Sequence, residues 1–454
     1  ACGIILYHPD TKITSLGNEF YDIVTPANFP KTELRYSDTF SMDTVGLNLT
    51  KSEWIKHFGL FDPLSNNLKK PLALRYHGHQ FHQYNPNLGD GRGFLYAQLR
   101  DNKGRLLDFG TKGSGQTPWS RGGDGKLTLL GGIREVLASR YLEHLGVNTS
   151  KTISLIETGE ELQRNDEPSP TRSAVMVRLS HSHIRFGTFQ RQAFLNKTDN
   201  LEKLTQYCIK NFYSGPCTPD ELLHAVVLKS SELVASWMVA GFVHGVMNTD
   251  NMNITGESFD YGPYRFLPSL KSNFTAAYFD HNSLYAFSRQ PEAMYWNLGQ
   301  LAQSLSLICS DKKLLKVLED FAPAYRDALR DNVFERLKIQ PKQNQKDFEF
   351  ISLTFKFLEN SQCSWPQFWH DWQGGANELM RAKRSENSDL YSGDEFVDWY
   401  NSLKEFEANG ASPKVDNPVR LLYEDIETLW KPIVQDNNWS EFIKKTESFQ
   451  RQSC

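Results

Sequence analysis

Residues 244–262, with the sequence HGVMNTDNMNITGESFDYG, constrain this chain more than any other stretch, because they gather histidine, aspartate and asparagine between apolar segments. Asp250 and Asn251 are adjacent, and Asp260 lies nine residues beyond Asn251. Carboxylate and amide oxygens at this spacing can reach one hard cation from two sides of a short hairpin, and they suit Mg²⁺, which usually shares its ligand shell with phosphate. The alternative is an ordinary turn at residues 248–253, since Asp and Asn are the commonest turn formers.

The same stretch repeats the spacing of the catalytic and metal loops of protein kinases, H-x-D-x-x-x-x-N followed by D-x-G. His244 takes the position of the kinase His, and Asn251 takes the position of the Asn. Val246 stands where a kinase has its catalytic Asp, so the usual base is missing while both metal ligands are present. Asp250 is the remaining carboxylate and is therefore the candidate general base.

The composition disfavours several other classes of protein. A net charge of −4 with 23% charged residues gives no basic excess for a nucleic-acid partner, and no apolar run approaches the length of a membrane span. The first ten residues are too short and too polar for a secretory signal, while a removed upstream targeting segment stays open. Six cysteines without a CxxC pair predict mostly buried thiols in a reducing compartment, not a disulfide framework or a zinc site.

A histidine-rich stretch and a glycine-rich loop lie in the first quarter of the chain. Residues 76–82, YHGHQFH, hold three histidines, which could form a metal cluster. No Cys or carboxylate stands at metal-ligand spacing, so we expect these histidines to pack or hydrogen-bond. In LGDGRG, residues 88–93, Gly89 and Gly91 let backbone N–H groups approach a ligand. Arg92 can donate two parallel hydrogen bonds to a phosphate group. The same letters also suit an ordinary hairpin turn.

A lysine and a glutamate further along predict a nucleotide-binding ion pair. Residues 93–113 are typical of two strands around a turn, and the second strand ends near Lys112. Residues 113–125 form a second glycine-rich loop with Asp124, and a helix with apolar residues at 3–4 spacing follows. Glu135 lies early in this helix, and a strand Lys paired with a helical Glu positions the lysine on phosphates in kinases. Alternatively, Glu135 pairs with a neighbouring Arg on a solvated helix face.

Two arginines seven residues apart, Arg178 and Arg185, stand at the exit of a predicted strand. Such a pair suits a clamp on a polyphosphate, although surface arginines are common. From about residue 188 the pattern becomes helical, and residues 219–245 predict a long helix that leads into the central stretch. Strands first and helices later indicate an α+β layout with two lobes that meet near residues 180–190.

Together these blocks resemble selenoprotein O, the SelO family of kinase-like protein adenylyltransferases. The resemblance runs from about residue 15 to about residue 310. It rests on HGHQF at 77–81, LGDGR at 88–92, KGSGQTPWSRGGDGK at 112–126, IRE at 133–135, SHIRFG at 182–187, HGVMNTDNM at 244–252 and DYGP at 260–263. It implies a bilobal protein-kinase-like fold of the α+β class, with a strand-rich N-lobe and a larger helical C-lobe between N- and C-terminal extensions. It also implies ATP bound in an inverted orientation, so that AMP passes to Ser, Thr or Tyr hydroxyls of proteins and pyrophosphate leaves.

The resemblance assigns roles to individual residues. It implies that Asp250 is the proton acceptor and that Asn251 and Asp260 hold Mg²⁺, or Mn²⁺ in its place. The implied nucleotide contacts, with Glu135 holding the lysine, are Gly89, Gly91, Arg92, Lys112, Asp124, Gly125, Arg178, Arg185 and Asp260. We expect a monomer with ATP and proteins as partners, no nucleic acid and no membrane. It would lie in the cytoplasm of a bacterium or the mitochondrion of a eukaryote.

The predicted organisation has four segments and no internal repeat. They are an N-terminal extension (1–75), an N-lobe with the nucleotide loops and the Lys–Glu pair (76–187), a C-lobe with the catalytic and metal loops (188–310), and a helical C-terminal extension of the C-lobe (311–454). Two other functions stay open: an inactive nucleotide-binding pseudokinase that works as a scaffold, and a true kinase. The intact set of Lys112, Asp250, Asn251 and Asp260 disfavours the scaffold, and Val246 disfavours the kinase.

The chain departs from the family pattern at a cysteine. The resemblance implies a disulfide between the loop after the metal aspartate and the C-terminal tail. Cys454 keeps the tail cysteine, but Ala276 stands at the loop position and offers no sulfur. We therefore expect activity that is nearly insensitive to reductant.

Overall fold

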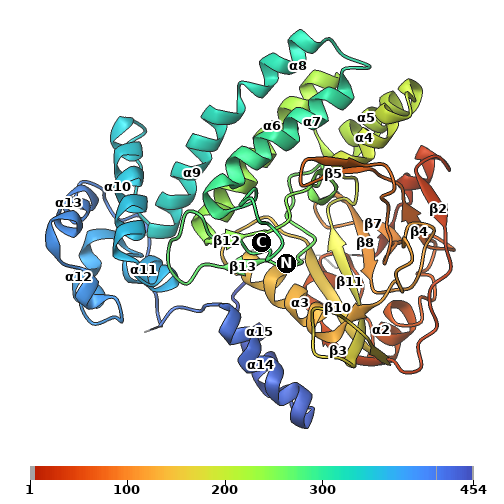
Figure 1. The fold of residues 1–454 in the computed structure, drawn as a ribbon, viewed down its shortest axis with the longest axis horizontal. Helices are drawn as coiled ribbons and strands as arrows, with labels where there is room; N and C mark the ends of the chain where they lie inside the picture. Colours follow the sequence, from red (N-terminus) through yellow and green to blue (C-terminus); the bar gives the residue numbers. More distant parts are fainter. Residues whose placement is uncertain (1–5, 416, 452–454) are drawn as a thin grey trace.

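The computed structural model describes residues 6–415 and 417–451, and it has a mixed α and β architecture in which most strands precede most helices (Figure 1). Its main sheet is curled and antiparallel, and it lies in one half of the molecule. The strands of this sheet are β1 (His8–Pro9), β2 (Tyr21–Ile23), β3 (Glu33–Ser37), β4 (Leu72–Leu74), β7 (Leu95–Arg100), β8 (Leu106–Lys112), β9 (Leu127–Thr128), β10 (Lys151–Leu162) and β11 (Thr171–Ser180). The main path runs β2-β4-β7-β8-β11-β10-β3, while β1 pairs with β7 and β9 pairs with β11.

Two short two-stranded sheets and fifteen α-helices make up most of the remaining regular structure of the described residues. The short strands are β5 (Gly78–Gln80), β6 (Gln83–Asn85), β12 (Phe242–Val243) and β13 (Arg265–Phe266). The helices are α1 (Thr39–Asp43), α2 (Lys51–Phe58), α3 (Leu129–His144), α4 (Phe186–Phe194), α5 (Thr198–Phe212), α6 (Pro219–Ala240), α7 (Gln290–Leu305), α8 (Asp311–Leu318), α9 (Phe321–Leu337), α10 (Gln345–Ser361), α11 (Trp365–Asp371), α12 (Leu379–Ala382), α13 (Gly393–Leu403), α14 (Tyr423–Asp436) and α15 (Ser440–Ser448).

The central strands are buried on both faces, so they separate two hydrophobic cores. Successive side chains of a strand point to opposite faces. On β11, Ala174 and Met176 join the core that includes α3, whereas Val175 and Val177 join the core that includes α2. The predicted hairpin over residues 93–113 is confirmed, because β7 and β8 pair antiparallel. This packing makes the strand that ends at Lys112 a rigid support.

The helices that frame the site begin and end as their sequences indicate. The hydroxyl of Thr128 accepts a hydrogen bond from Gly131 N at the start of α3, and Pro219 stands in the first turn of α6. Helix α6 stops at Gly241, which adopts a left-handed φ of 67°, so the long predicted helix is confirmed but ends before the central stretch. Among the described residues, α6 alone is long and apolar enough to cross a membrane. However, 72% of its most apolar window is buried inside this fold.

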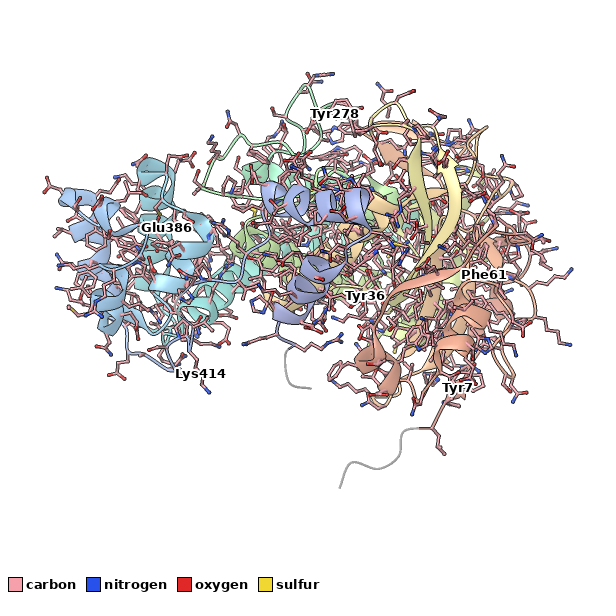
Figure 2. All side chains as sticks on the ribbon, turned by 90° about the horizontal axis from the view of Figure 1, so that it is seen from below. Tyr7, Tyr36, Phe61, Tyr278, Glu386 and Lys414 are labelled. Carbon is pink, nitrogen blue, oxygen red and sulfur yellow. The ribbon has the colours of Figure 1, made fainter. Side chains whose placement is uncertain are left out.

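The C-terminal third forms a separate aromatic core and then returns to the sheet. The aromatic residues of α11 and of its C-terminal end are all buried in this core: Trp365, Phe368, Trp369 and Trp372. Beyond it, α14 and α15 lie next to Tyr36 of the sheet (Figure 2), whose ring is 6.3 Å from that of Phe442. The guanidinium of Arg172 on β11 donates a hydrogen bond of 2.9 Å to the Ile433 carbonyl of α14. The last two helices therefore pack against the N-terminal half of the structure.

Residues 1–75 contribute strands β1 to β4 to the main sheet. Helix α2 within them begins after Thr50, which forms a reciprocal cap with Glu53. The boundary between residues 75 and 76 thus lies within one sheet. The division of the chain into four segments stays a prediction.

Candidate active site

A cavity of about 720 Å³ opens between the sheet and the loops that follow α6. It contains every residue that the sequence proposed for the site except Glu135, which lies behind Lys112. Those lining residues are Gly89, Gly91, Arg92, Lys112, Asp124, Gly125, Arg178, Arg185, Asp250, Asn251 and Asp260. Residues from four distant parts of the chain thus meet in one place.

Lys112, at the end of β8, forms a buried ion pair with Glu135 of α3. Their side chains are 9% and 3% exposed, which contradicts the alternative of a solvated helix face for Glu135. Burial, followed by the nearby Arg92 charge, lowers the pKa of Lys112 well below its usual value. Arg92 itself has no ion-pair partner among the described residues. The cavity therefore carries positive charge that an anionic ligand can neutralise.

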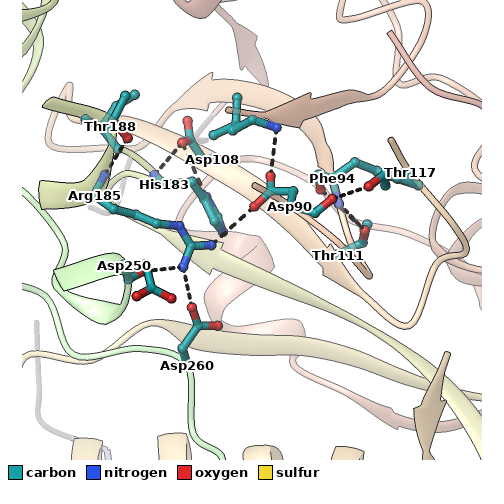
Figure 3. A network of polar contacts seen from close by, with 12 residues as sticks. Asp90, Phe94, Asp108, Thr111, Thr117, His183, Arg185, Thr188, Asp250 and Asp260 are labelled. Atoms are coloured by element: carbon teal, nitrogen blue, oxygen red, sulfur yellow. Dashed lines mark hydrogen bonds and ion pairs between the residues drawn. The ribbon is translucent and has the colours of Figure 1, made fainter. Parts of the chain in front are cut away.

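Arg178 and Arg185 converge on Asp260 (Figure 3 shows the Arg185 contacts). Arg178 Nη1 lies 2.5 Å from Oδ1 of Asp260, and Arg185 Nη1 lies 2.5 Å from Oδ2. Although burial opposes ionisation of this carboxyl, the two guanidinium groups hold the pKa of Asp260 well below its usual range. Asp260 also has a left-handed φ of 62°, a costly conformation for a residue with a Cβ atom. Its carboxylate is thus held ionised at a fixed place.

Asp250 and Asn251 lie on the 3-10 turn η2 (Thr249–Asn251). Asp250 is 8% exposed, and its Oδ1 atom accepts no hydrogen bond from the described residues. Burial raises the pKa of Asp250 to about 6. The amide Nδ2 of Asn251 donates to the Val246 carbonyl at 2.9 Å, which turns its Oδ1 oxygen away from that carbonyl. The turn therefore presents one weakly held carboxylate and one oriented amide oxygen.

The two glycine-rich loops lie against each other instead of forming two independent turns. A Cβ atom at Gly89 would lie 2.4 Å from Cγ of Trp119, so only glycine leaves room for the indole. The hydroxyls of Thr117 and Ser120 donate hydrogen bonds of 2.5 Å to the carbonyls of Asp90 and Gly91. The sequence offered a nucleotide contact or a hairpin turn for Gly89, and the structure shows that this glycine also fits the two loops together.

Several residues in or next to the cavity were not identified from the sequence. Arg164 comes from the connection between β10 and β11, and its guanidinium binds both oxygens of Asp124 at 2.8 and 3.1 Å. Tyr76 and Phe259 lie on Arg185, with ring centroids 4.5 and 4.8 Å from its guanidinium carbon. Of these residues, only Tyr76 could have been suspected from the sequence, because it directly precedes the HGHQF motif.

The three histidines of residues 76–82 pack and hydrogen-bond, as expected. His77 Nδ1 lies 2.8 Å from the Tyr84 hydroxyl, and His82 stacks on Trp296 with ring centroids 3.9 Å apart. Within the described part of the chain, no group of three or more His, Cys, Asp or Glu side chains is placed to hold a metal. A metal in the cavity would therefore depend on few protein ligands and on its nucleotide.

Comparison with known proteins identifies the family. A model of the protein adenylyltransferase SelO family matches residues 5–450. The chain belongs to the SelO family. A relative from Synechocystis, named protein nucleotidyltransferase YdiU, is 43% identical over 96% of this chain and 96% of its own length. Relatives of the same name from Trichormus variabilis (42% identical, 98% of this chain and 97% of the relative) and Aliivibrio fischeri (35%, 66% and 61%) also match. Membership of SelO implies a nucleotide substrate.

The cysteine position expected from other SelO proteins is occupied here by buried Ala276, beside Gly245. The cysteines within the described residues are free: Cys208 and Cys363 are buried, Cys309 is partly buried, and Cys217 is exposed. Burial raises the pKa of Cys363 to about 11, which makes this thiol unreactive at neutral pH. The tail cysteine, Cys454, lies outside the described residues.

Proposed function

We propose that this SelO protein transfers AMP from ATP to Ser, Thr or Tyr hydroxyls of proteins and releases pyrophosphate, with Mg²⁺ as its metal. The observation that carries the proposal is the meeting of four cations, Arg92, Lys112, Arg178 and Arg185, with the buried carboxylate of Asp250 in one cavity. Cations bind a triphosphate, and a buried carboxylate with a raised pKa can accept a proton.

We infer a bilobal protein-kinase-like arrangement for this site. The Lys112–Glu135 pair joins a strand to the helix packed on the sheet, as in the N-lobe of a kinase. The loops with Asp250 and Asp260 follow α6, which packs on α7 and α9. The proposed lobes are residues 76–187 and 188–310, and the terminal segments 1–75 and 311–454 complete them.

The proposed reaction is one displacement at the α-phosphorus of ATP. The hydroxyl oxygen of the acceptor forms a bond to this phosphorus, and the bond to the bridging oxygen of the pyrophosphate breaks. Asp250 takes the proton that the hydroxyl loses. Lys112, Arg178 and Arg185 stabilise the negative charge that accumulates on the departing pyrophosphate, which is the main catalytic contribution expected for this chemistry. Val246, in place of a kinase aspartate, supplies no second base.

The donor set of the cavity fits a hard divalent cation. Asp260 supplies an ionised carboxylate, and Asn251 supplies an amide oxygen oriented through its bond to Val246. These two residues would hold Mg²⁺, and Mn²⁺ suits the same oxygen donors. When bound, the metal neutralises charge on the phosphate oxygens of ATP.

ATP labelled at the α- or the γ-phosphate tests the proposal directly. We expect label to enter protein from the α-position only, in a reaction that EDTA stops. Incorporation from γ-labelled ATP alone would instead show a kinase, and absence of both labels from protein, with ATP still bound, would show a nucleotide-binding scaffold.

The state and location of the protein are part of the same proposal. We propose that it works as a monomer with ATP and protein partners, without nucleic acid or membrane, in a reducing compartment. This compartment would be the cytoplasm in a bacterium or the mitochondrion in a eukaryote. The free cysteines of the described residues and the buried position of α6 support the assignment.

Reductant is expected to change the rate of AMP transfer by less than about twofold, because Ala276 cannot form the disulfide implied by the family. Initial rates measured with and without dithiothreitol check this expectation, and Cys454→Ser is the companion variant. A several-fold activation by dithiothreitol that disappears in Cys454→Ser would show that another cysteine pairs with the tail.

A further inference from the structure

The hairpin of β5 and β6, which carries the HGHQF motif, lies against the turn that bears Asp250. The backbone N–H of His79 donates a hydrogen bond of 2.7 Å to Oγ1 of Thr249, and the N–H of Phe81 donates one of 3.0 Å to Oδ1 of Asn248. These acceptors directly precede Asp250 in the chain. The hairpin therefore holds the backbone that leads into the catalytic turn, across about 170 residues of sequence.

A glutamine of α4 closes this contact into a ring of three residues, in which His79 takes part through both its backbone and its side chain. The Thr249 hydroxyl donates to Oε1 of Gln190 at 2.5 Å, and Nε2 of Gln190 lies 2.7 Å from Nδ1 of His79. Burial lowers the pKa of His79, which favours the neutral ring that can accept this bond. Thr249 and Gln190 are buried, so each lost bond would leave an unsatisfied polar group.

The hairpin also touches the Asp250 carboxyl group itself. A Cβ atom at Gly78 would lie 2.7 Å from Oδ1 of Asp250 and 3.0 Å from its Cβ. Contacts this short do not occur, so any other residue at position 78 would displace the carboxylate. The nearest of these atoms, Oδ1, lies at the end of the side chain and accepts no hydrogen bond from the described residues, so rotation of the Asp250 carboxylate can relieve the closest contact.

We propose that the β5–β6 hairpin positions the catalytic carboxylate: Gly78 leaves the space that Asp250 occupies, and the ring of Thr249, Gln190 and His79 fixes the turn that carries it. This assignment rests on the proposed role of Asp250 as proton acceptor. These four residues act through Asp250, so they are positioning residues. Gln80 of the same hairpin lines the cavity, so the hairpin forms part of the cavity wall.

Two substitutions separate positioning from general packing. In Gly78→Ala, we expect the initial transfer rate at saturating ATP to fall about 10- to 100-fold, the usual effect of a misplaced reacting group. The KM for ATP and the melting temperature should stay close to those of the wild type. Gly299→Ala is the matched control, because a Cβ atom at Gly299 of α7 meets nothing within 4 Å. The control should keep the wild-type rate.

The hydroxyl of Thr249 provides the second test, in which one variant removes the hydroxyl and another retains it. Thr249→Val keeps the shape of the side chain but loses the bonds to His79 and Gln190, so we expect a similar 10- to 100-fold loss of rate. Thr249→Ser keeps the hydroxyl and should restore the rate to within about threefold of the wild type. Rates are measured with α-labelled ATP and a heat-treated bacterial lysate as the acceptor mixture.

Each outcome decides the proposal. Loss of rate with unchanged KM for ATP, recovered by Thr249→Ser, supports positioning. Wild-type rates in both Gly78→Ala and Thr249→Val, or losses that only follow a lowered melting temperature, overturn it while AMP transfer by the wild type stands. An inactive wild type in the same assay overturns the proposed function, and the positioning role with it.

Discussion

Asp250→Asn is expected to slow AMP transfer by about two to four orders of magnitude, the range typical of a lost general base, while ATP affinity changes by less than about threefold. The structure explains why the two effects separate. Arg185 bonds the backbone carbonyl of Asp250, not its carboxylate, so the phosphate-binding arginine keeps this contact in the variant. Oδ1 of Asp250 accepts no hydrogen bond from the described residues, so the isosteric amide loses no partner there.

The measurement pairs initial rates from α-labelled ATP with ATP binding by calorimetry. Asp389→Asn is a suitable control, since this aspartate is exposed in the C-terminal helical region and does not line the cavity. A large loss of ATP binding in Asp250→Asn, comparable to its loss of rate, would contradict the role of proton acceptor and make Asp250 part of the nucleotide or metal site.

Asp260→Ala is expected to abolish the Mg²⁺ dependence of ATP binding and to reduce transfer by about 10³-fold or more. Asp260 is one of only two protein oxygens proposed for the metal, and its carboxylate also receives both Arg178 and Arg185. Removing it leaves two buried guanidinium groups without this partner, which is expected to destabilise the fold by about 3–5 kcal/mol. The variant should therefore lose both metal binding and thermal stability.

Calorimetric titration of ATP with Mg²⁺ and with EDTA measures the metal dependence, and a thermal melt measures the stability. Asp260→Asn separates the two effects, since its amide can bond one arginine but carries no charge for the metal. Transfer by Asp260→Ala close to the wild-type rate would remove this residue from the site.

The local patterns of the sequence determined the main elements of the fold and the residues around the cavity. The β7–β8 hairpin, the start of α3 and the existence of α6 follow from short-range signals: two apolar runs around a turn, a Thr cap and helical apolar spacing. Three site residues could be recognised from the sequence: Lys112, Asp250 and Asp260. Phosphoryl-transfer chemistry needs a lysine and carboxylates next to glycine-rich or turn-forming segments. Each of these signals lies within a few residues of the feature it predicts.

The sequence alone did not reveal contacts between distant segments. Arg164 reaches Asp124 across 40 residues, Thr249 bonds His79 across 170, and Arg172 bonds Ile433 across 261. No local period or cap encodes such pairs, because they depend on how strands and helices pack after they form. The same limit applies to glycine: the letters of residues 78 and 89 show only that a side chain is absent. The tertiary structure alone shows that the Asp250 carboxylate and the Trp119 indole fill those spaces.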